Sequence, residues 1–201
     1  LGIPCMTAWC CLFGDGPIAG QTILVSGGAG AVGHYAVQLA KGGGARVIAT
    51  VSSPQKAEQA RLAGADLVIN YKSEDVIAKA MAFTGGRGVD RVVDVDFGGN
   101  IATTLKIMAV NSTIAVYATN GNRTPVIPMR ELMEKCIALR TLVLYAPPLL
   151  AAGQADISKW LAGGPRIHNV AAQFPLSETA QAHLAVEKGD KLGTVIVDCA
   201  R

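Results

Sequence analysis

The sequence predicts an α/β fold in which a doubly wound, six-stranded parallel sheet is followed by a short C-terminal helix–strand tail. First, short runs rich in β-branched residues alternate with helix-like segments. Second, several of these runs are continuously apolar, which is typical of strands covered by helices on both faces. Third, half of the 201 residues are hydrophobic and only 16% are charged, so the chain can bury a large core.

The strands follow one another with a helix-like segment between each pair. Expected strands lie at 22–26, 46–51, 67–70, 90–95, 113–118 and 141–146, and a further strand at 193–198 belongs to the tail. This β–α–β order indicates parallel strands joined by right-handed crossovers. The pattern changes after 163–165, so we expect the tail to lie outside the six-stranded sheet.

Capping signals place the helices. Ser53 and Pro54 supply a cap and a first-turn proline for a helix that Gly64 ends. Ser73 supplies a cap, with an acidic first turn, for the next helix. Further helices are expected at 31–40, 76–83, 129–139, 148–162 and, in the tail, between Ser177 and Gly189.

Composition excludes several classes of protein. The net charge of +3 is spread without basic runs, which argues against nucleic-acid binding. Pro147 and Pro148 split the longest apolar stretch below the roughly 18 residues that a membrane-spanning helix needs. Five cysteines without CxxC spacing favour reduced thiols in the cytoplasm over disulfides or a zinc site. The opening segment is typical of the middle of a fold, so we expect a fragment.

A glycine-rich turn follows the first strand. Residues 28–33 fit the pattern GxGxxG and lead into a helix-like segment with one apolar face. In such a turn the glycines permit a tight bend, a close approach to a pyrophosphate and close helix–strand packing, while the helix N-terminus attracts phosphate. A turn without a ligand is the alternative. For His34, in the first helical turn, a packing role is favoured over a pyrophosphate contact.

The end of the second strand indicates which nucleotide is bound. An NAD site usually carries an acidic residue about 20 residues beyond the glycines. Here Ser52 stands in that window, no carboxylate occurs before Glu58, and Lys56 is nearby. A lysine attracts a 2′-phosphate, so the pattern favours NADP(H). Lys56 as a solvated surface lysine is the alternative.

Four motifs in this order make the sequence resemble a known family: LVSGGAGAVGHYAVQLAK, VIATVSSPQKAEQARLAGADLVINYKSED, GVDRVVDV and PLSETAQAHLAVEKGDKLGTVIVD. The chain resembles the zinc-independent NADPH:quinone oxidoreductase (zeta-crystallin-like) branch of the medium-chain dehydrogenase/reductase superfamily. The resemblance implies a Rossmann fold and an enzyme that transfers hydride from NADPH to a quinone or a similar electron-poor acceptor. An enal or enoyl reductase and a non-catalytic NADP-binding sensor module are the alternatives.

The resemblance also implies individual cofactor contacts. Lys56 and Tyr71, with Ser52 beside them, match residues that hold the 2′-phosphate, although Tyr71 could instead pack as an aromatic side chain. Phe97, Asn120 and Thr7 match positions near the nicotinamide and its ribose. The complete predicted cofactor set is Gly28, Gly30, Ala31, Val32, Gly33, Ser52, Lys56, Tyr71, Phe97, Asn120 and Thr7, with no metal ligand or catalytic residue assigned. For Asp94 and Asp96, strand-end capping is favoured over catalysis.

The resemblance divides the chain into two parts. Residues 1–168 match the NADP-binding domain, and 169–201 match the return segment of an N-terminal GroES-like catalytic domain that is largely missing from this sequence. The chain alone is therefore expected to reduce quinones poorly. Family members pair through the strand matching 141–146, so a homodimer is expected, with a small quinone-like molecule as substrate.

Overall fold

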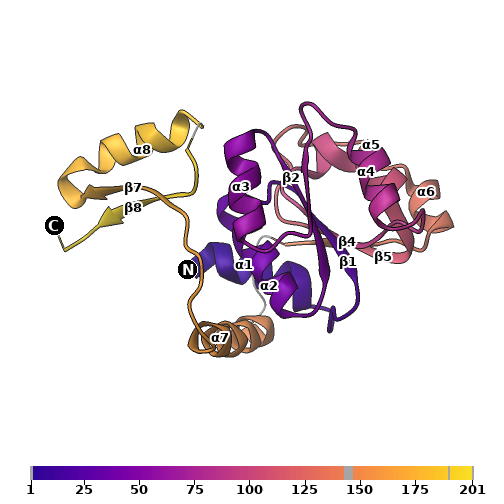
Figure 1. Cartoon of the computed structure of the whole chain (residues 1–201), viewed down its shortest axis with the longest axis horizontal. Helices are drawn as coiled ribbons and strands as arrows, with labels where there is room; N and C mark the ends of the chain where they lie inside the picture. Colours follow the sequence, from indigo (N-terminus) through magenta and orange to yellow (C-terminus); the bar gives the residue numbers. More distant parts are fainter. Residues whose placement is uncertain (1, 143–146, 190, 201) are drawn as a thin grey trace.

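The computed structural model describes residues 2–142, 147–189 and 191–200, and within them a six-stranded parallel sheet forms the centre (Figure 1). Its strands are β1 (Thr22–Val25), β2 (Arg46–Val51), β3 (Leu67–Asn70), β4 (Val89–Asp94), β5 (Met108–Val116) and β6 (Ala138–Thr141). Their order is β3-β2-β1-β4-β5-β6, so the chain winds outward from β1 in one direction and then returns to build the other half. The predicted doubly wound fold is confirmed.

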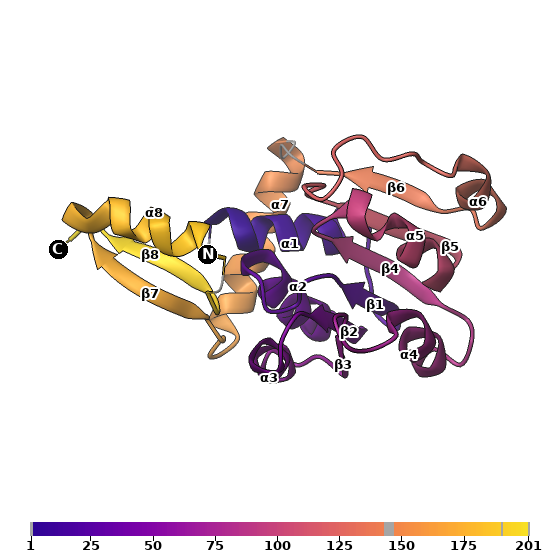
Figure 2. The same cartoon turned by 90° about the horizontal axis from the view of Figure 1, so that it is seen from above.

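Helices follow the strands as expected for such a sheet. They are α1 (Gly2–Phe13), α2 (Ala31–Gly42), α3 (Pro54–Leu62), α4 (Val76–Phe83), α5 (Phe97–Ile107), α6 (Met129–Glu134), α7 (Pro147–Ala162) and α8 (Thr179–Glu187), with a 3₁₀ turn at Leu176–Glu178. The tail contains β7 (Val170–Pro175) and β8 (Thr194–Asp198), which pair in parallel as a separate two-stranded sheet. Figures 1 and 2 show this tail (yellow) on the side of α1 and α2, away from β4, β5 and β6.

Two apolar clusters lie on opposite faces of the sheet. Ile23 and Val25 of β1 belong to the cluster that includes α1, α2 and α3, whereas Leu24 belongs to the cluster that includes α4 and α5. All four residues of β1 are buried, since helices cover both of its faces. This burial explains why the strand reads as a continuous apolar run.

Several predicted boundaries were wrong. The sixth strand ends at Thr141 rather than beginning there, and 143–146 lie outside the described residues. The helix expected at 129–139 ends at Glu134, because Cys136 adopts a left-handed φ of 51° that helices exclude. The cap of α4 is Asp75, whose side chain accepts a hydrogen bond from the Ala78 amide at 3.0 Å, rather than Ser73. The predicted cap at Ser53 is confirmed, since it accepts from the Lys56 amide.

Three elements were not predicted. The strand β7 lacks a strong apolar run, and α5 opens with two glycines directly after a phenylalanine. The helix α1 is apolar nearly all round and therefore has no amphipathic stripe to reveal it. Its buried position between α2 and α7 explains that composition (Figure 2).

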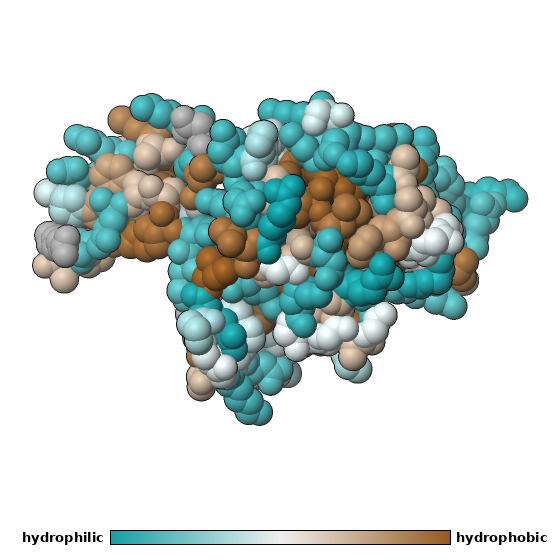
Figure 3. All heavy atoms as spheres, in the orientation of Figure 1, coloured by the Kyte–Doolittle hydropathy of each residue, from teal (hydrophilic) through white to brown (hydrophobic). Residues whose placement is uncertain are grey.

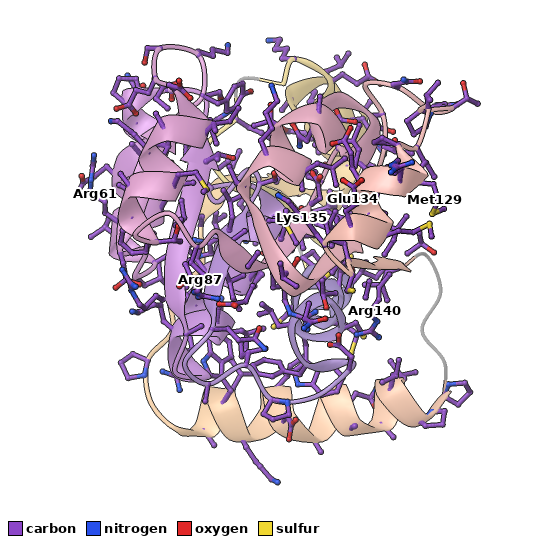
Figure 4. The ribbon with its side chains drawn as sticks, turned by 90° about the vertical axis from the view of Figure 1, so that its right-hand side faces the viewer. Arg61, Arg87, Met129, Glu134, Lys135 and Arg140 are labelled. Carbon is purple, nitrogen blue, oxygen red and sulfur yellow. The ribbon has the colours of Figure 1, made fainter. Side chains whose placement is uncertain are left out.

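A largely buried ion cluster joins α1 to the central and edge strands. The Arg91 side chain, at the start of β4, lies 2.8 and 2.9 Å from the two carboxylate oxygens of Asp15 and donates to the Cys11 carbonyl at 2.9 Å. Arg140 of β6 also pairs with Asp15 at 2.8 Å (Figure 4). These contacts fix the amino ends of the strands, whose carboxyl ends carry the candidate site. No helix in the described parts of the chain is both long and apolar enough to cross a membrane.

Candidate functional site

The turn between β1 and α2 is built on glycine for two separate reasons. Gly27 has a φ of +68°, a left-handed conformation that other residues rarely adopt. Gly28 and Gly33 are required by packing: a Cβ on Gly28 would lie 2.6 Å from the Ala49 side chain, and one on Gly33 would collide with the Gly27 carbonyl oxygen. The predicted set contained Gly28 and Gly33 but missed Gly27.

The amino end of α2 is left open by this turn. Gly30 precedes the helix and donates its own amide to the Gly27 carbonyl at 2.8 Å, and no side chain caps the helix. The first amides of a helix have no acceptor within the helix, and the helix dipole gives this end a partial positive charge. The end is therefore suited to an anionic group.

A cleft of about 390 Å³ lies in front of that helix end. Its lining residues come from the glycine-rich turn, from the carboxyl ends of neighbouring strands and from the tail: Gly27, Ala29, Gly30, Ala31, Val32, Val51, Ser52, Lys56, Tyr71, Val95, Tyr117, Gly189, Lys191 and Gly193. No acidic side chain is among these described lining residues. The cleft is thus electropositive.

Ser52, Lys56 and Tyr71, which the sequence analysis assigned to the 2′-phosphate, all line this cleft. The Lys56 ammonium donates to the Ser52 hydroxyl at 3.1 Å, across one turn between the end of β2 and α3. Tyr71 follows β3 and is 53% exposed, so it is not packed in the core. A hydroxyl, a cation and a phenol thus lie together where a carboxylate would mark an NAD site.

A second cleft, of about 540 Å³, adjoins the first and shares Gly27, Tyr71 and Val95 with it. It lies between α4 and α5, and its other lining residues include Glu74, Asp75, Ile77, Asp96 and Asn100. The pKa of Glu74 is lowered by hydrogen bonds from Lys79 and from the Asn70 amide. This cleft is therefore acidic and partly apolar, in contrast to the first.

Asp94 and Asp96 order the loops between the clefts. The Asp94 carboxylate accepts from the Asp96 amide at 3.0 Å and from the Asn100 side chain at 2.7 Å. Asp96 accepts from the Gly121 amide at 2.8 Å and so joins the loops after β4 and β5. Burial raises the pKa of Asp94, while these hydrogen bonds oppose the increase. Both carboxylates cap strand ends, as the sequence analysis favoured.

Three predicted contacts lie away from the two clefts. Phe97 is 5% exposed and packs in the core between α5 and the sheet. Asn120 is exposed on the loop after β5, and Thr7 is buried in α1, where its hydroxyl donates to the Ile3 carbonyl at 2.8 Å. None of the three lines either cleft. Their assignment to the nicotinamide end stays a prediction.

Sequence reasoning missed several side chains that line the first cleft, among them Tyr117 and Lys191. Tyr117 follows β5, and its place at the carboxyl end of a central strand was the available signal. Burial, with Cys11 and Asp94 nearby, raises the pKa of Tyr117, so the hydroxyl is neutral at physiological pH. Lys191 comes from the tail, and no sequence pattern indicated its position.

His34 anchors the chain that leads to the tail. Its Nε2 lies 2.7 Å from the Ile167 carbonyl, and its Nδ1 lies 3.1 Å from the Asn169 side-chain nitrogen. An N–H donor on Nε2 and an acceptor on Nδ1 satisfy both contacts, so the ring is neutral. Burial is the main cause that lowers the pKa of His34 below its ordinary value of 6.5, despite the Ile167 contact. The favoured packing role is consistent with this geometry.

This arrangement predicts an acid-sensitive anchor. The folded-state pKa of His34 is depressed, so its stabilising contribution is present above about pH 6.5 and is lost as the pH falls through the folded value. Between about pH 7.5 and pH 5, we expect the free energy of unfolding to fall more in the wild type than in His34→Gln. Urea denaturation at both pH values measures this difference. Equal decreases in the two proteins would contradict the assignment.

Within the residues that the structure describes, no three His, Cys, Asp or Glu side chains come together as a metal site.

The sheet order, the glycine turn and the cleft define a class: an α/β protein with the architecture of a Rossmann dinucleotide-binding domain. Residues 31–159 match the family described as zinc-binding dehydrogenase, and the chain belongs to that family. The predicted resemblance to medium-chain dehydrogenases/reductases is thereby confirmed.

Individual relatives agree with this assignment. The chain is 29% identical over 187 residues to the 2-haloacrylate reductase of a Burkholderia species, covering 89% of this chain and 55% of that protein. A crystal structure of an NAD-dependent alcohol dehydrogenase superposes with a TM-score of 0.89 at 26% identity, covering 98% of this chain and 57% of that one. The Escherichia coli quinone oxidoreductase complexed with NADPH gives a TM-score of 0.85 at 25% identity, covering 98% and 63%. This chain thus spans a little over half the length of these relatives.

Proposed function

We propose that the chain is the cofactor-binding part of an NADPH-dependent oxidoreductase that transfers hydride to a quinone or a similar electron-poor acceptor. One observation carries the proposal: the uncapped amino end of α2 and the group of Ser52, Lys56 and Tyr71 share a single cleft, and none of its described lining residues carries a carboxylate. Because the structural neighbours include proteins described with NAD and with NADPH, the choice of NADP(H) rests on these side chains.

Each part of the dinucleotide has a matching part of the site. The diphosphate fits the open amides at Ala31 and Val32, and a 2′-phosphate fits the Lys56 ammonium. The adenine fits the larger cleft against Val95, which borders both clefts. The nicotinamide end would then extend toward Tyr117. NADPH supplies the hydride, and the residues of this chain bind and orient it.

For the molecule that accepts the hydride, we propose a chemical class rather than a particular compound. A quinone is favoured by the quinone oxidoreductase among the structural neighbours, whereas the 2-haloacrylate reductase supports an electron-poor alkene as the alternative. A non-catalytic NADP-binding sensor is the third candidate. A panel of quinones and activated alkenes, offered with NADPH to the full-length protein, separates them: turnover identifies the acceptor class, and absence of all turnover contradicts the proposed enzyme.

We further propose that 169–201 belong to a second, GroES-like catalytic domain, while 1–168 form the NADP-binding domain. The support is the separate two-stranded sheet of the tail, on which Figure 3 shows brown, apolar surface. The exposed apolar residues of the tail are Val170, Leu176, Leu184, Val186 and Ile196. Zinc-independent catalysis, a cytoplasmic location and a homodimer paired through the edge strand β6 are further proposals.

The domain proposal predicts that the 201-residue chain binds NADPH but reduces quinones poorly, because the acceptor needs both domains. Quinone-dependent oxidation of NADPH, followed by absorbance, measures this activity. Turnover by the 201-residue chain equal to that of the full-length protein would contradict the domain proposal.

A further inference from the structure

The loops that follow β4 and β5 are joined by hydrogen bonds around Asp96. The Asp96 carboxylate accepts from the Gly121 amide at 2.8 Å, and the backbone of Asp96 pairs with Thr119 in an isolated antiparallel bridge. The Thr119 hydroxyl accepts from the Gly98 amide at 3.0 Å and donates to the Asn122 carbonyl at 2.6 Å. We call these five residues the loop junction.

Three glycines permit this close approach. A Cβ on Gly98 would collide with the Asn122 carbonyl oxygen. A Cβ on Gly99 or on Gly121 would collide with an oxygen of the Asp96 carboxylate. That carboxylate could move aside only by giving up its hydrogen bond from the Gly121 amide. Since glycine is a poor helix former, Gly98 and Gly99 weaken the start of α5, and the loop junction explains why they stand there.

The loop junction lies beside both clefts. Asp96 lines the second cleft, and Val95, directly before it, borders both clefts. Tyr117, two residues before Thr119, lines the first cleft. Val95 and Tyr117 therefore stand at the roots of the two loops that the junction joins. A movement of one loop relative to the other would change the spacing between these two lining residues.

The carboxylate of Asp96 makes a distinct contribution to this junction. Among the described residues, Asp96 is the only one outside 119–124 whose side chain bonds to this loop. Gly121 is exposed, so without the carboxylate its amide would bond to water. A hydrogen bond to a charged acceptor is about twice as strong as one between neutral groups. We therefore expect the carboxylate to hold an otherwise solvent-exposed loop in one place.

We propose that Asp96 is a positioning residue for the nicotinamide half of the cofactor. By holding the loop after β5 against the start of α5, it sets the spacing of Val95 and Tyr117. This inference rests on the proposed function, in which the nicotinamide end extends toward Tyr117 while the 2′-phosphate lies at Lys56. Because Asp96 acts through the loop, its loss should weaken binding of the nicotinamide half and spare the half that carries adenine and the 2′-phosphate.

The test is an isothermal titration of the 201-residue chain with NADPH and with 2′,5′-ADP, which carries the adenine and the 2′-phosphate but no nicotinamide. Asp96→Ala should raise the dissociation constant of NADPH by about 10-fold and leave that of 2′,5′-ADP within about threefold. Removal of a negative charge alone would favour both anionic ligands, so the expected loss cannot arise from charge. Asp96→Asn keeps an oxygen that can accept from the Gly121 amide and should bind NADPH within about threefold of the wild type.

Two further variants complete the comparison. Gly121→Ala retains Asp96 but displaces its carboxylate, so it should reproduce the pattern of Asp96→Ala. Asp90→Ala is the matched control. The Asp90 carboxylate also accepts from a backbone amide, that of Thr22 at 2.7 Å, but Asp90 lies near the amino ends of β1 and β4 and lines neither cleft. Asp90→Ala should bind both ligands as the wild type does.

Hydrogen–deuterium exchange, measured by mass spectrometry, reports on the loop itself. Exchange in a peptide that contains Gly121 should be faster in Asp96→Ala than in the wild type or in Asp90→Ala, because the amide has lost its acceptor. Equal exchange rates would show that Asp96 does not hold the loop and would overturn the proposal.

The binding outcomes separate the inference from the proposed function. Equal losses of NADPH and 2′,5′-ADP affinity in Asp96→Ala would place the effect at the adenine half and overturn the inference, while the proposed function stands. Unchanged NADPH affinity in that variant would overturn it as well. If the wild-type chain binds neither ligand, the proposed function fails and this inference fails with it.

Discussion

Gly33→Ala should weaken NADPH binding by about 100-fold, since the new Cβ would collide with the Gly27 carbonyl oxygen and push the first turn of α2 out of place. Each charge-assisted hydrogen bond from that turn to phosphate contributes roughly 1.5–3 kcal/mol, so losing one or two of them is sufficient for this effect. Isothermal titration with NADPH measures the change, and circular dichroism shows whether the variant remains folded.

Gly42→Ala is the matched control for this experiment. It makes the same substitution in the same helix, but the nearest atom to the new Cβ is the Trp160 nitrogen at 3.6 Å, an ordinary contact. Alanine is also a better helix former than glycine, so the control should bind NADPH normally. If Gly33→Ala binds NADPH as tightly as Gly42→Ala does, the account of the glycine turn is wrong.

Lys56→Ala should raise the dissociation constant of NADPH by about 10- to 100-fold and leave that of NADH within about threefold. The reason is that the Lys56 ammonium, held beside the Ser52 hydroxyl, meets the 2′-phosphate that NADH lacks. Competition titrations with both cofactors measure the two constants.

Lys72→Ala controls for the loss of one positive charge. Lys72 is an exposed neighbour of Tyr71 and lines neither cleft. Its removal should change both affinities little, because exposed charges at a distance are screened by salt. Equal losses of NADPH and NADH affinity in Lys56→Ala would place that lysine at the shared phosphates and contradict its role in cofactor choice.

Much of the fold could be predicted because its signals are local. The buried strands β1 and β2 are continuous apolar runs, and the Ser53 cap and the glycine turn are short-range features. The sequence analysis placed the edge strand β6 at the wrong residues, because none of its four residues is fully buried. One of them is Arg140, whose side chain pairs with Asp15. Tertiary contacts, rather than local preference, determine where that strand forms.

The candidate site also contains residues that could be predicted from the sequence and residues that could not. Ser52, Lys56 and Tyr71 follow neighbouring strands, and parallel strands bring their carboxyl ends to one edge of a sheet, so their meeting was predictable. Lys191 was not predictable, since its place depends on hydrogen bonds between α2 and residues more than 100 positions away. Phe97 was assigned to the nicotinamide by resemblance alone, yet its side chain packs in the core.

The central claim is that the cleft in front of α2 binds a dinucleotide and selects it by its 2′-phosphate. The most direct measurement is a titration of the wild-type 201-residue chain with NADPH and with NADH under the same buffer and salt. We expect the chain to bind both cofactors, with NADPH bound at least about 10-fold more tightly, as one additional charge-assisted contact would give. Equal affinities, or tighter binding of NADH, would contradict it.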